Sequence, residues 1–362
     1  MIGKRHLAAH AVLAMLVVTA IITASGTTSP AQADAVADFY KGKTVNLLIG
    51  AAPGGGFDIG GRLMARFMGK YIPGEPNIVP QNMQGAGGLR MANTLANTAP
   101  KDGTTFGIHV RGIIQQPMLG DATARFDPLT GMTWIGTMSS AKYDTYLLVM
   151  HKNSGVKTYE DMRRKDKQFS LGSVGGISTN VIFALVSPEL FGLNTRLIKG
   201  YAGSAGVMLA VQRHEVDGSF IGLSSLVGAQ SELLKSGDLV PVIQLARTQR
   251  HPQFPNVPMG RELVNKPDDA ALLAFMESLF FVALPFSGPA GIPAERTKAL
   301  REAFMKANAD PEYVAEATKM NVDISPLDGE AVTKIIAEMT ATPAPVLERY
   351  KKILAIADDE KK

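Results

Sequence analysis

Four glycine-rich segments are the parts of this sequence best suited to bind a ligand. They read Pro-Gly-Gly-Gly-Phe-Asp at residues 53–58, Gly-Ala-Gly-Gly at 85–88, Gly-Gly-Ile-Ser-Thr at 175–179 and Tyr-Ala-Gly-Ser at 201–204. Each precedes a predicted helix, whose first N–H groups lack partners within the helix and whose dipole is positive at that end. Because glycine also lets the backbone approach a ligand closely, the segments predict a cage of backbone donors suited to a carboxylate.

The candidate ligand-binding residues come mainly from these segments, which contain no arginine or lysine. Asp58 opens a predicted helix, where capping N–H groups or pairing with Arg62 is a more favoured role than contact with an anion. Tyr201 either lines the binding site or packs beside it. The full set is Pro53, Gly54, Gly55, Gly56, Phe57, Asp58, Gly85, Ala86, Gly87, Gly88, Arg111, Gly175, Gly176, Ser178, Thr179, Tyr201, Gly203, Ser204 and Asp217.

Arg111 is the charged candidate for contact with an acidic ligand. It follows a predicted strand at the end where ligands bind in parallel α/β sheets. A guanidinium there could hold a second carboxylate through two parallel hydrogen bonds. An ordinary surface arginine fits the sequence equally well, so both interpretations stay open.

A secreted serine hydrolase is the alternative function. Residues 202–206 resemble the nucleophile turn of α/β-hydrolases, and Asp217 or Asp238 and then His251 follow Ser204 in the chain order of that class. Against it, Ala202 stands where that turn has its first glycine, and an HGGG-type oxyanion motif is absent. The glycine segments also fail the P-loop and dinucleotide patterns. We therefore expect a binding protein with no catalytic residues, no cofactor and no metal.

The elements that must position these segments occur in the same order twice. Each unit reads strand, glycine segment, helix, strand, glycine segment, helix, strand, which predicts parallel sheets with crossover helices and therefore two α/β lobes. The first unit has strands at 44–51, 77–83 and 104–110 and helices beginning near Ile59 and Leu89. The second has strands at 168–173, 195–199 and 219–223 and helices at 181–190 and 207–214.

Two apolar runs, at residues 146–150 and 239–245, are predicted to be hinge strands between the lobes. The first lobe would then comprise residues 34–145 and 246–362, and the second residues 146–245. The later part of the first lobe is predicted to contain a strand at 279–284 and helices at 294–307, 311–320, 329–339 and 345–355. Trp134 is expected near the hinge, or else in the core of the first lobe.

The start of the chain predicts export. Lys4 and Arg5 precede an apolar run at residues 11–22 and the sequence Ala31-Gln32-Ala33, so residues 1–33 are typical of a cleavable signal peptide. An uncleaved anchor helix is the alternative. Without Lys4 and Arg5, the 37 basic residues become 35 against 33 acidic residues, a balance that does not suggest a nucleic-acid partner. The absence of cysteine excludes disulfides and a lipid-attached cysteine.

In several motifs the sequence resembles the extracytoplasmic receptors of tripartite tricarboxylate transporters, the Bug family. The resemblance covers nearly all of the chain after the signal segment. The motifs are P-G-G-G-x-D at 53–58 followed by Arg62, N-x-x-G-A-G-G at 82–88, A-P-K-D-G-T-T at 99–105, the Ser/Gly loop at 172–178, Y-x-G-S at 201–204, E-V-D at 215–217 and P-N-V-P at 255–258. His214 replaces the usual glycine before E-V-D.

The resemblance implies a two-lobed fold like that of periplasmic binding proteins, with mixed, mostly parallel sheets and a ligand cleft between the lobes. It also implies a monomeric periplasmic receptor that delivers a small carboxylate to the membrane subunits of such a transporter. Residues 109–111 and 198–203 depart from the family pattern. Dicarboxylates, tricarboxylates and aromatic acids all remain open as ligands.

Overall fold

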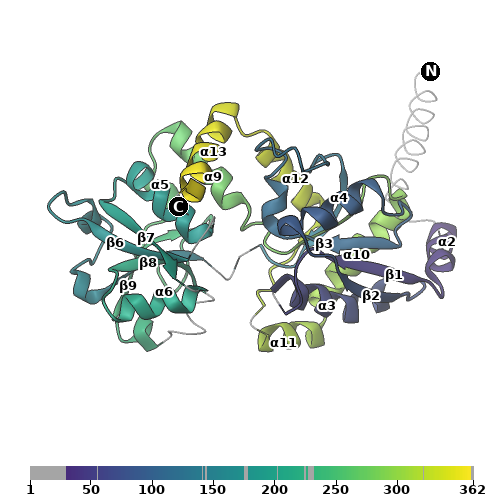
Figure 1. The fold of residues 1–362 in the computed structure, drawn as a ribbon. Helices are drawn as coiled ribbons and strands as arrows, with labels where there is room; N and C mark the ends of the chain where they lie inside the picture. Colours follow the sequence, from purple (N-terminus) through teal and green to yellow (C-terminus); the bar gives the residue numbers. More distant parts are fainter. Residues whose placement is uncertain are drawn as a thin grey trace, which may run out of the picture.

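The computed structural model describes residues 30–54, 56–140, 142, 145–174, 178–201, 203–223, 226, 232–320 and 322–359. Most of the predicted signal segment and the candidates Gly55, Gly175 and Gly176 lie outside these ranges. The described chain forms two mixed sheets, each covered by helices on both faces (Figure 1). This confirms the prediction of a two-lobed α/β fold.

The first sheet has the strand order β11-β4-β10-β3-β1-β2. Its strands are β1 (Thr44–Ile49), β2 (Asn77–Asn82), β3 (Thr105–Ile108), β4 (Met132–Thr137), β10 (Pro285–Pro289) and β11 (Leu327–Asp328). β1 runs parallel to β2 and β3, and β4 shares that direction because β3 and β4 both pair antiparallel with β10. The predicted strands at 44–51, 77–83 and 104–110 are confirmed.

Side chains alternate between the two faces of this sheet, as expected for buried strands. On β1, Leu47 and Ile49 join one core with α3 (Gly56–Met68), α10 (Ala294–Ala309) and α11 (Pro311–Lys319). Leu48 joins the opposite core with α4 (Leu89–Asn97) and α12 (Gly329–Thr340). The remaining helices of this region are α2 (Pro30–Tyr40) and the short 3-10 helices η1 (Gly69–Tyr71), η2 (Ala86–Gly88) and η3 (Arg111–Ile114).

The second sheet has the order β7-β6-β8-β5-β9. Its strands are β5 (Tyr146–His151), β6 (Phe169–Val174), β7 (Thr195–Tyr201), β8 (Gly218–Gly222) and β9 (Leu239–Leu245). β6 runs parallel to β7 and β8, while β5 is antiparallel to both β8 and β9, so that β9 points the same way as β8. The two predicted hinge strands are thus confirmed as strands, and they pair with each other inside this sheet.

The helices of the second sheet come from distant parts of the chain. One face is covered by α6 (Gly203–Gln212). The other is covered by α5 (Thr179–Phe191), α9 (Pro267–Ser278) and the last helix, α13 (Ala344–Asp359), which lies beside α9 (Figure 1). Tyr350 of α13 and Phe275 of α9 pack edge to face at 5.4 Å. Short helices η4 (Lys152–Ser154), η5 (Glu160–Arg163) and α8 (Gly260–Leu263) complete this region.

In the part of the chain that the structure describes, three passages join the two sheets. The passages are residues 138–145 between β4 and β5, residues 279–284 between α9 and β10, and residues 341–343 between α12 and α13. The predicted strand at 279–284 is therefore wrong. Its backbone turns there instead, since the N–H groups of Phe280 and Phe281 donate to the carbonyls of Glu277 and Ser278, and the strand begins at Pro285.

Trp134 lies in a core of the first sheet, which was the second of its two expected positions. It is on β4, only 1% of its surface is exposed, and its Nε1 donates to the carbonyl of Pro128 at 2.8 Å. The sequence analysis had not predicted β4 itself. Its Met-Thr-Trp-Ile-Gly-Thr sequence mixes polar and apolar residues without a clear two-residue period.

Candidate functional site

A cleft of about 2520 Å³ lies between the two sheets. Its lining includes residues that follow the carboxyl ends of β1, β3 and β4 in the first sheet and of β6, β8 and β9 in the second. Ligands of open α/β sheets bind at that edge, so both sheets present their binding edge to one space. Among the predicted residues, Gly56, Phe57, Arg111, Ser178 and Thr179 line it.

Asp58 organises the first glycine segment instead of facing the cleft. Its carboxylate accepts hydrogen bonds from the N–H of Gly54 (2.9 Å), from Nε of Arg62 (2.9 Å) and from Nδ2 of Asn82 (2.8 Å). Burial acts to raise the pKa of Asp58, but these hydrogen bonds outweigh it and lower the pKa below the ordinary value. The charged carboxylate therefore holds the turn in shape, and the pairing with Arg62 is confirmed.

The second glycine segment, residues 85–88, packs against residues next to Arg111. Gly88 has a left-handed backbone with φ of 104°, and a Cβ there would lie 3.2 Å from side-chain atoms of Val110 and Ile113. Glycine thus lets residues 85–88 pack tightly against η3, which carries Arg111. Gly85, Ala86 and Gly87 also have positive φ. These four residues do not line the cleft in the structure.

Arg111 is placed at the cleft by a strand whose end is fixed by a buried histidine. The ring of His109 is fully buried, its Nε2 lies 2.7 Å from Oγ of Ser287, and burial lowers its pKa to about 3. His109 is therefore neutral and brings no charge of its own. The guanidinium of Arg111, two residues later, lies 4.9 Å from the centre of the Phe280 ring.

In the second sheet, the predicted residues that reach the cleft, among those the structure describes, are Ser178 and Thr179 at the start of α5. The Ser178 hydroxyl donates to Oδ1 of Asn180. Tyr201 packs on the core under α6. Ser204 is exposed at the start of α6, and neither it nor Gly203 is a lining residue of the cleft. Pro53 and Gly54 in the first sheet likewise lie outside its lining.

Asp217 lies at the opposite edge of the second sheet. It immediately precedes β8, and its carboxylate accepts hydrogen bonds from the N–H (2.8 Å) and Oγ (2.7 Å) of Ser170 near the start of β6. The amino ends of these parallel strands point away from the cleft. Asp217 therefore tethers two strands, and we leave it out of the proposed site.

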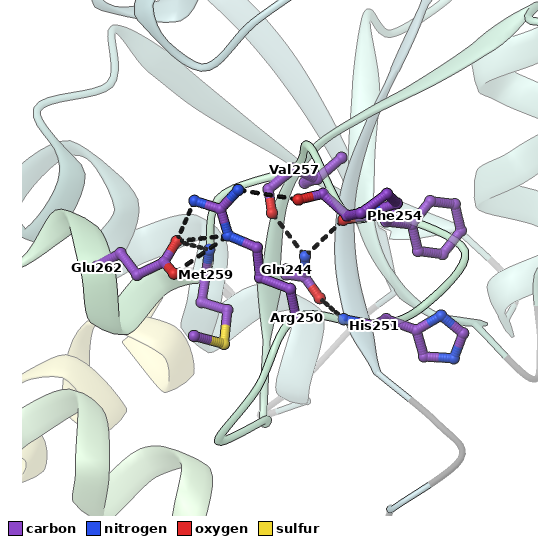
Figure 2. A network of polar contacts seen from close by, with 8 residues as sticks. Gln244, Arg250, His251, Phe254, Val257, Met259 and Glu262 are labelled. Atoms are coloured by element: carbon purple, nitrogen blue, oxygen red, sulfur yellow. Dashed lines mark hydrogen bonds and ion pairs between the residues drawn. The ribbon is translucent and has the colours of Figure 1, made fainter.

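A cleft-lining loop that the sequence analysis did not select follows β9. Residues 246–253 all line the cleft. Gln244 shapes the chain that follows (Figure 2). Its Nε2 donates to the carbonyls of Phe254 (3.0 Å) and Val257 (2.6 Å), and its Oε1 accepts from the N–H of His251 (2.6 Å).

An ion pair between Arg250 and Glu262 also holds this loop in place. The guanidinium of Arg250 donates to both carboxylate oxygens of Glu262 at 2.8–3.1 Å and to the carbonyl of Pro255 at 2.9 Å (Figure 2). Gln244 was the sequence signal that could have identified this loop. A glutamine inside the apolar run of residues 239–245 is expected to be buried, and a buried amide needs several hydrogen-bond partners nearby.

Glu277 fixes the point where this loop begins. Its carboxylate accepts the N–H of Ala246 (2.8 Å) and pairs with Arg261. Burial raises the pKa of Glu277, against the opposing influence of Arg261. Ala246 has a left-handed backbone with φ of 61°, which is uncommon for a residue with a Cβ. Strained backbone of this kind is often found at binding sites.

The hydrolase alternative is not supported by these contacts. In a catalytic triad, the histidine Nδ1 carries a hydrogen and donates a hydrogen bond through it to the aspartate. Here the Nδ1 of His251 accepts the N–H of Gln253 at 3.2 Å. Asp217 is held by Ser170, and Asp238 pairs with Lys152 and Ser236.

Within the described ranges, no three His, Asp or Glu side chains gather so as to hold a metal ion. Across the same part of the chain, none of the helices combines the length and the apolar character needed to cross a membrane.

Comparisons with known proteins agree with this architecture. The family model described as tripartite tricarboxylate transporter family receptor matches residues 62–351. A protein of Cupriavidus necator, called UPF0065 protein in gbd 5'region, is 24% identical over 356 residues, which cover 96% of this chain and 97% of that protein.

Solved structures show the same fold. A TctC solute binding protein from Polaromonas is 19% identical with a TM-score of 0.66, and the match covers 88% of this chain and 99% of that one. A Rhodopseudomonas palustris protein with adipate is 19% identical with a TM-score of 0.55, and the match covers 87% of this chain and 97% of that one.

Proposed function

Because the chain belongs to the tripartite tricarboxylate transporter receptor family, we propose that it captures a small organic carboxylate in the cleft between its lobes. The observation that carries this proposal is the convergence of strand carboxyl ends from both sheets on one cleft that contains Arg111. Support also comes from the similar Rhodopseudomonas palustris structure, which holds adipate, a carboxylate. The function is binding and release, without a chemical step.

We also propose where the protein acts and which partner it serves. The signal-like segment at residues 1–33 would export the chain to the periplasm, where it would act as a monomer. It would then hand its ligand to the membrane subunits of a tripartite tricarboxylate-type transporter.

The lobes that close on the ligand are also part of the proposal. The sequence placed all residues after 245 in the first lobe. The shared core of α9, α13 and β5 favours assigning α8, α9 and α13 to the second lobe, with residues 279–284 and 341–343 as crossings in addition to residues 138–145. Three crossings would guide a hinge more tightly than two.

Closure is expected from the size of the cleft. Pockets for small ligands usually measure about 300–1,000 Å³, and the cleft of about 2520 Å³ exceeds that range. A ligand that contacts both lobes favours the closed arrangement, because only that arrangement makes both sets of contacts.

A thermal-shift experiment on the exported form tests this function. Carboxylates that bind only the folded protein raise its apparent melting temperature. Gly56→Trp should abolish that rise, because Gly56 lines the cleft and a Cβ at this residue meets no atom within 4 Å. Leu209→Trp is the matched control, since Leu209 is 42% exposed on α6 and is not a lining residue. An equal rise in both variants would refute binding in the cleft.

A further inference from the structure

A small second cavity of about 60 Å³ adjoins the cleft. Arg111, Thr179, Ile182, Leu279 and Tyr350 line both spaces. The other residues around the small cavity are apolar, namely Phe183, Met276 and Phe280. It is therefore an apolar recess of the cleft and not a separate site.

The walls of the recess come from several elements. α5 supplies Ile182 and Phe183, while Phe280 comes from the crossing after α9. The rings of Phe183 and Phe280 both pack on Tyr146, with centroids 5.6 Å apart in each pair. Aromatic side chains held in such a cluster keep a fixed surface for an apolar group.

A single positive charge marks one edge of the recess. Among the residues that the structure describes around it, Arg111 is the only charged one. Its guanidinium lies over the Phe280 ring at 4.9 Å, a cation–π distance. A ligand seated here would meet a cation on one side and apolar walls on the other.

We propose that the recess, whose volume of about 60 Å³ leaves room for only a few carbon atoms, receives the apolar tip of the ligand, so that the protein selects carboxylates whose body ends in an aromatic edge or a branched aliphatic group over dicarboxylates and tricarboxylates. This inference rests on the proposed function, which places the carboxylate group in the cleft. Arg111, Thr179 and Tyr350, which carry donors, line both spaces and so lie where the recess meets the cleft. A second carboxylate that passed them and entered between Phe183, Met276 and Phe280 would lose its water without gaining a donor, which is strongly unfavourable. An apolar body in the same place is stabilised by leaving water.

The test compares five ligands by calorimetry on the exported form: acetate, phenylacetate, 4-methylpentanoate, succinate and citrate. Phenylacetate and 4-methylpentanoate should bind at least tenfold more tightly than acetate, succinate or citrate. Ile182→Asn should remove this preference, because it places an amide on the wall of the recess. Leu185→Asn is the matched control, since Leu185 lies one turn away on α5, is half-buried and lines neither space.

The possible results distinguish a failure of the apolar recess from a failure of carboxylate binding itself. Tighter binding of succinate or citrate, unchanged in Ile182→Asn, would overturn the apolar recess and leave carboxylate capture standing. Failure of all five ligands to bind would overturn both. Equal losses in Ile182→Asn and Leu185→Asn would also contradict the recess, because they would reflect a general weakening of α5.

Discussion

The guanidinium of Arg111 lies 4.9 Å over the Phe280 ring, and this contact joins the segment after β3 to the segment that leaves α9. The first segment belongs to the first sheet and the second is one of the crossings between the sheets, so the contact lies where the lobes meet. Stacking on the ring restricts the arginine side chain before any ligand arrives. A cation held in this way loses little further freedom when it binds an anion.

Arg111→Ala should weaken carboxylate binding by about 2 kcal/mol, or roughly 30-fold, as for the loss of one charge-assisted hydrogen bond. Calorimetry with the tightest carboxylate of the series measures the loss. Arg111→Lys should recover only part of it, because an ammonium cannot form the paired contact of a guanidinium. Affinities of Arg111→Ala within twofold of the original would remove this residue from the site.

Gln244→Ala should destabilise the protein by about 3 kcal/mol or more. The change removes the amide partner of the His251 N–H and of the Val257 carbonyl, while the Phe254 carbonyl keeps the N–H of Val257. Each unsatisfied buried group costs about 1–3 kcal/mol. Urea unfolding gives the free energy, and hydrogen exchange should show faster exchange at residues 251–257.

Gln253→Ala is the control for that experiment. Gln253 lines the cleft in the same loop but is exposed, so its substitution should change stability by less than about 0.5 kcal/mol. Similar losses in the two variants would mean that the amide of Gln244 does not organise the loop.

Asp310→Asn should make the protein less sensitive to acid between about pH 4 and pH 2. Lys70, Tyr71 and the first N–H groups of α11 hold the pKa of Asp310 at about 2, below its ordinary value of 3.8. A lowered folded-state pKa contributes stability above the unfolded pKa, and that contribution is lost as the pH falls towards 2. The asparagine variant lacks this contribution at any pH.

Urea midpoints measured across that pH range test the Asp310 prediction. Asp328→Asn is the control for the loss of a helix cap. Asp328 accepts hydrogen bonds from the N–H groups of Glu330 and Ala331 at the start of α12, as Asp310 does at the start of α11. If the urea midpoint of Asp310→Asn fell with pH as steeply as that of the wild-type protein, protonation of Asp310 would not be the cause of the acid sensitivity.

Ligand binding should also make the molecule more compact. Small-angle scattering at saturating carboxylate should give a smaller radius of gyration than the ligand-free protein, with a midpoint that matches calorimetry. Trp134 is not the right reporter for this motion, because it is buried in the first lobe away from the cleft lining. An unchanged radius would indicate a rigid site.

The repeated order of strands, glycine segments and helices predicted the sheets well, because local periodicity specifies which elements form. The cleft was predicted less completely. The start of loop 246–253 is fixed by the contact of Glu277 with Ala246, and these two residues are 31 positions apart in the sequence. The same limit explains the position of α13, since an amphipathic helix can pack on either lobe and only the fitted partner, here Phe275, decides.

Asp58 and Asp217 show how far residue type alone can specify a site. Each is a carboxylate next to a glycine-containing motif, yet Asp58 is taken up by Gly54, Arg62 and Asn82, and Asp217 by Ser170. A carboxylate cannot contribute to an anion site while its charge is already used within the scaffold. The sequence alone does not reveal these hydrogen-bond partners, because they depend on how the backbone folds.

The central claim is that the cleft captures a carboxylate through its charge, and paired calorimetric titrations test it most directly. The exported form is titrated with the tightest-binding carboxylate of the series and with the primary amide of the same compound. The account predicts saturable binding of the acid, at least 30-fold tighter than that of the amide, which corresponds to about 2 kcal/mol. Equal affinities for acid and amide would contradict it.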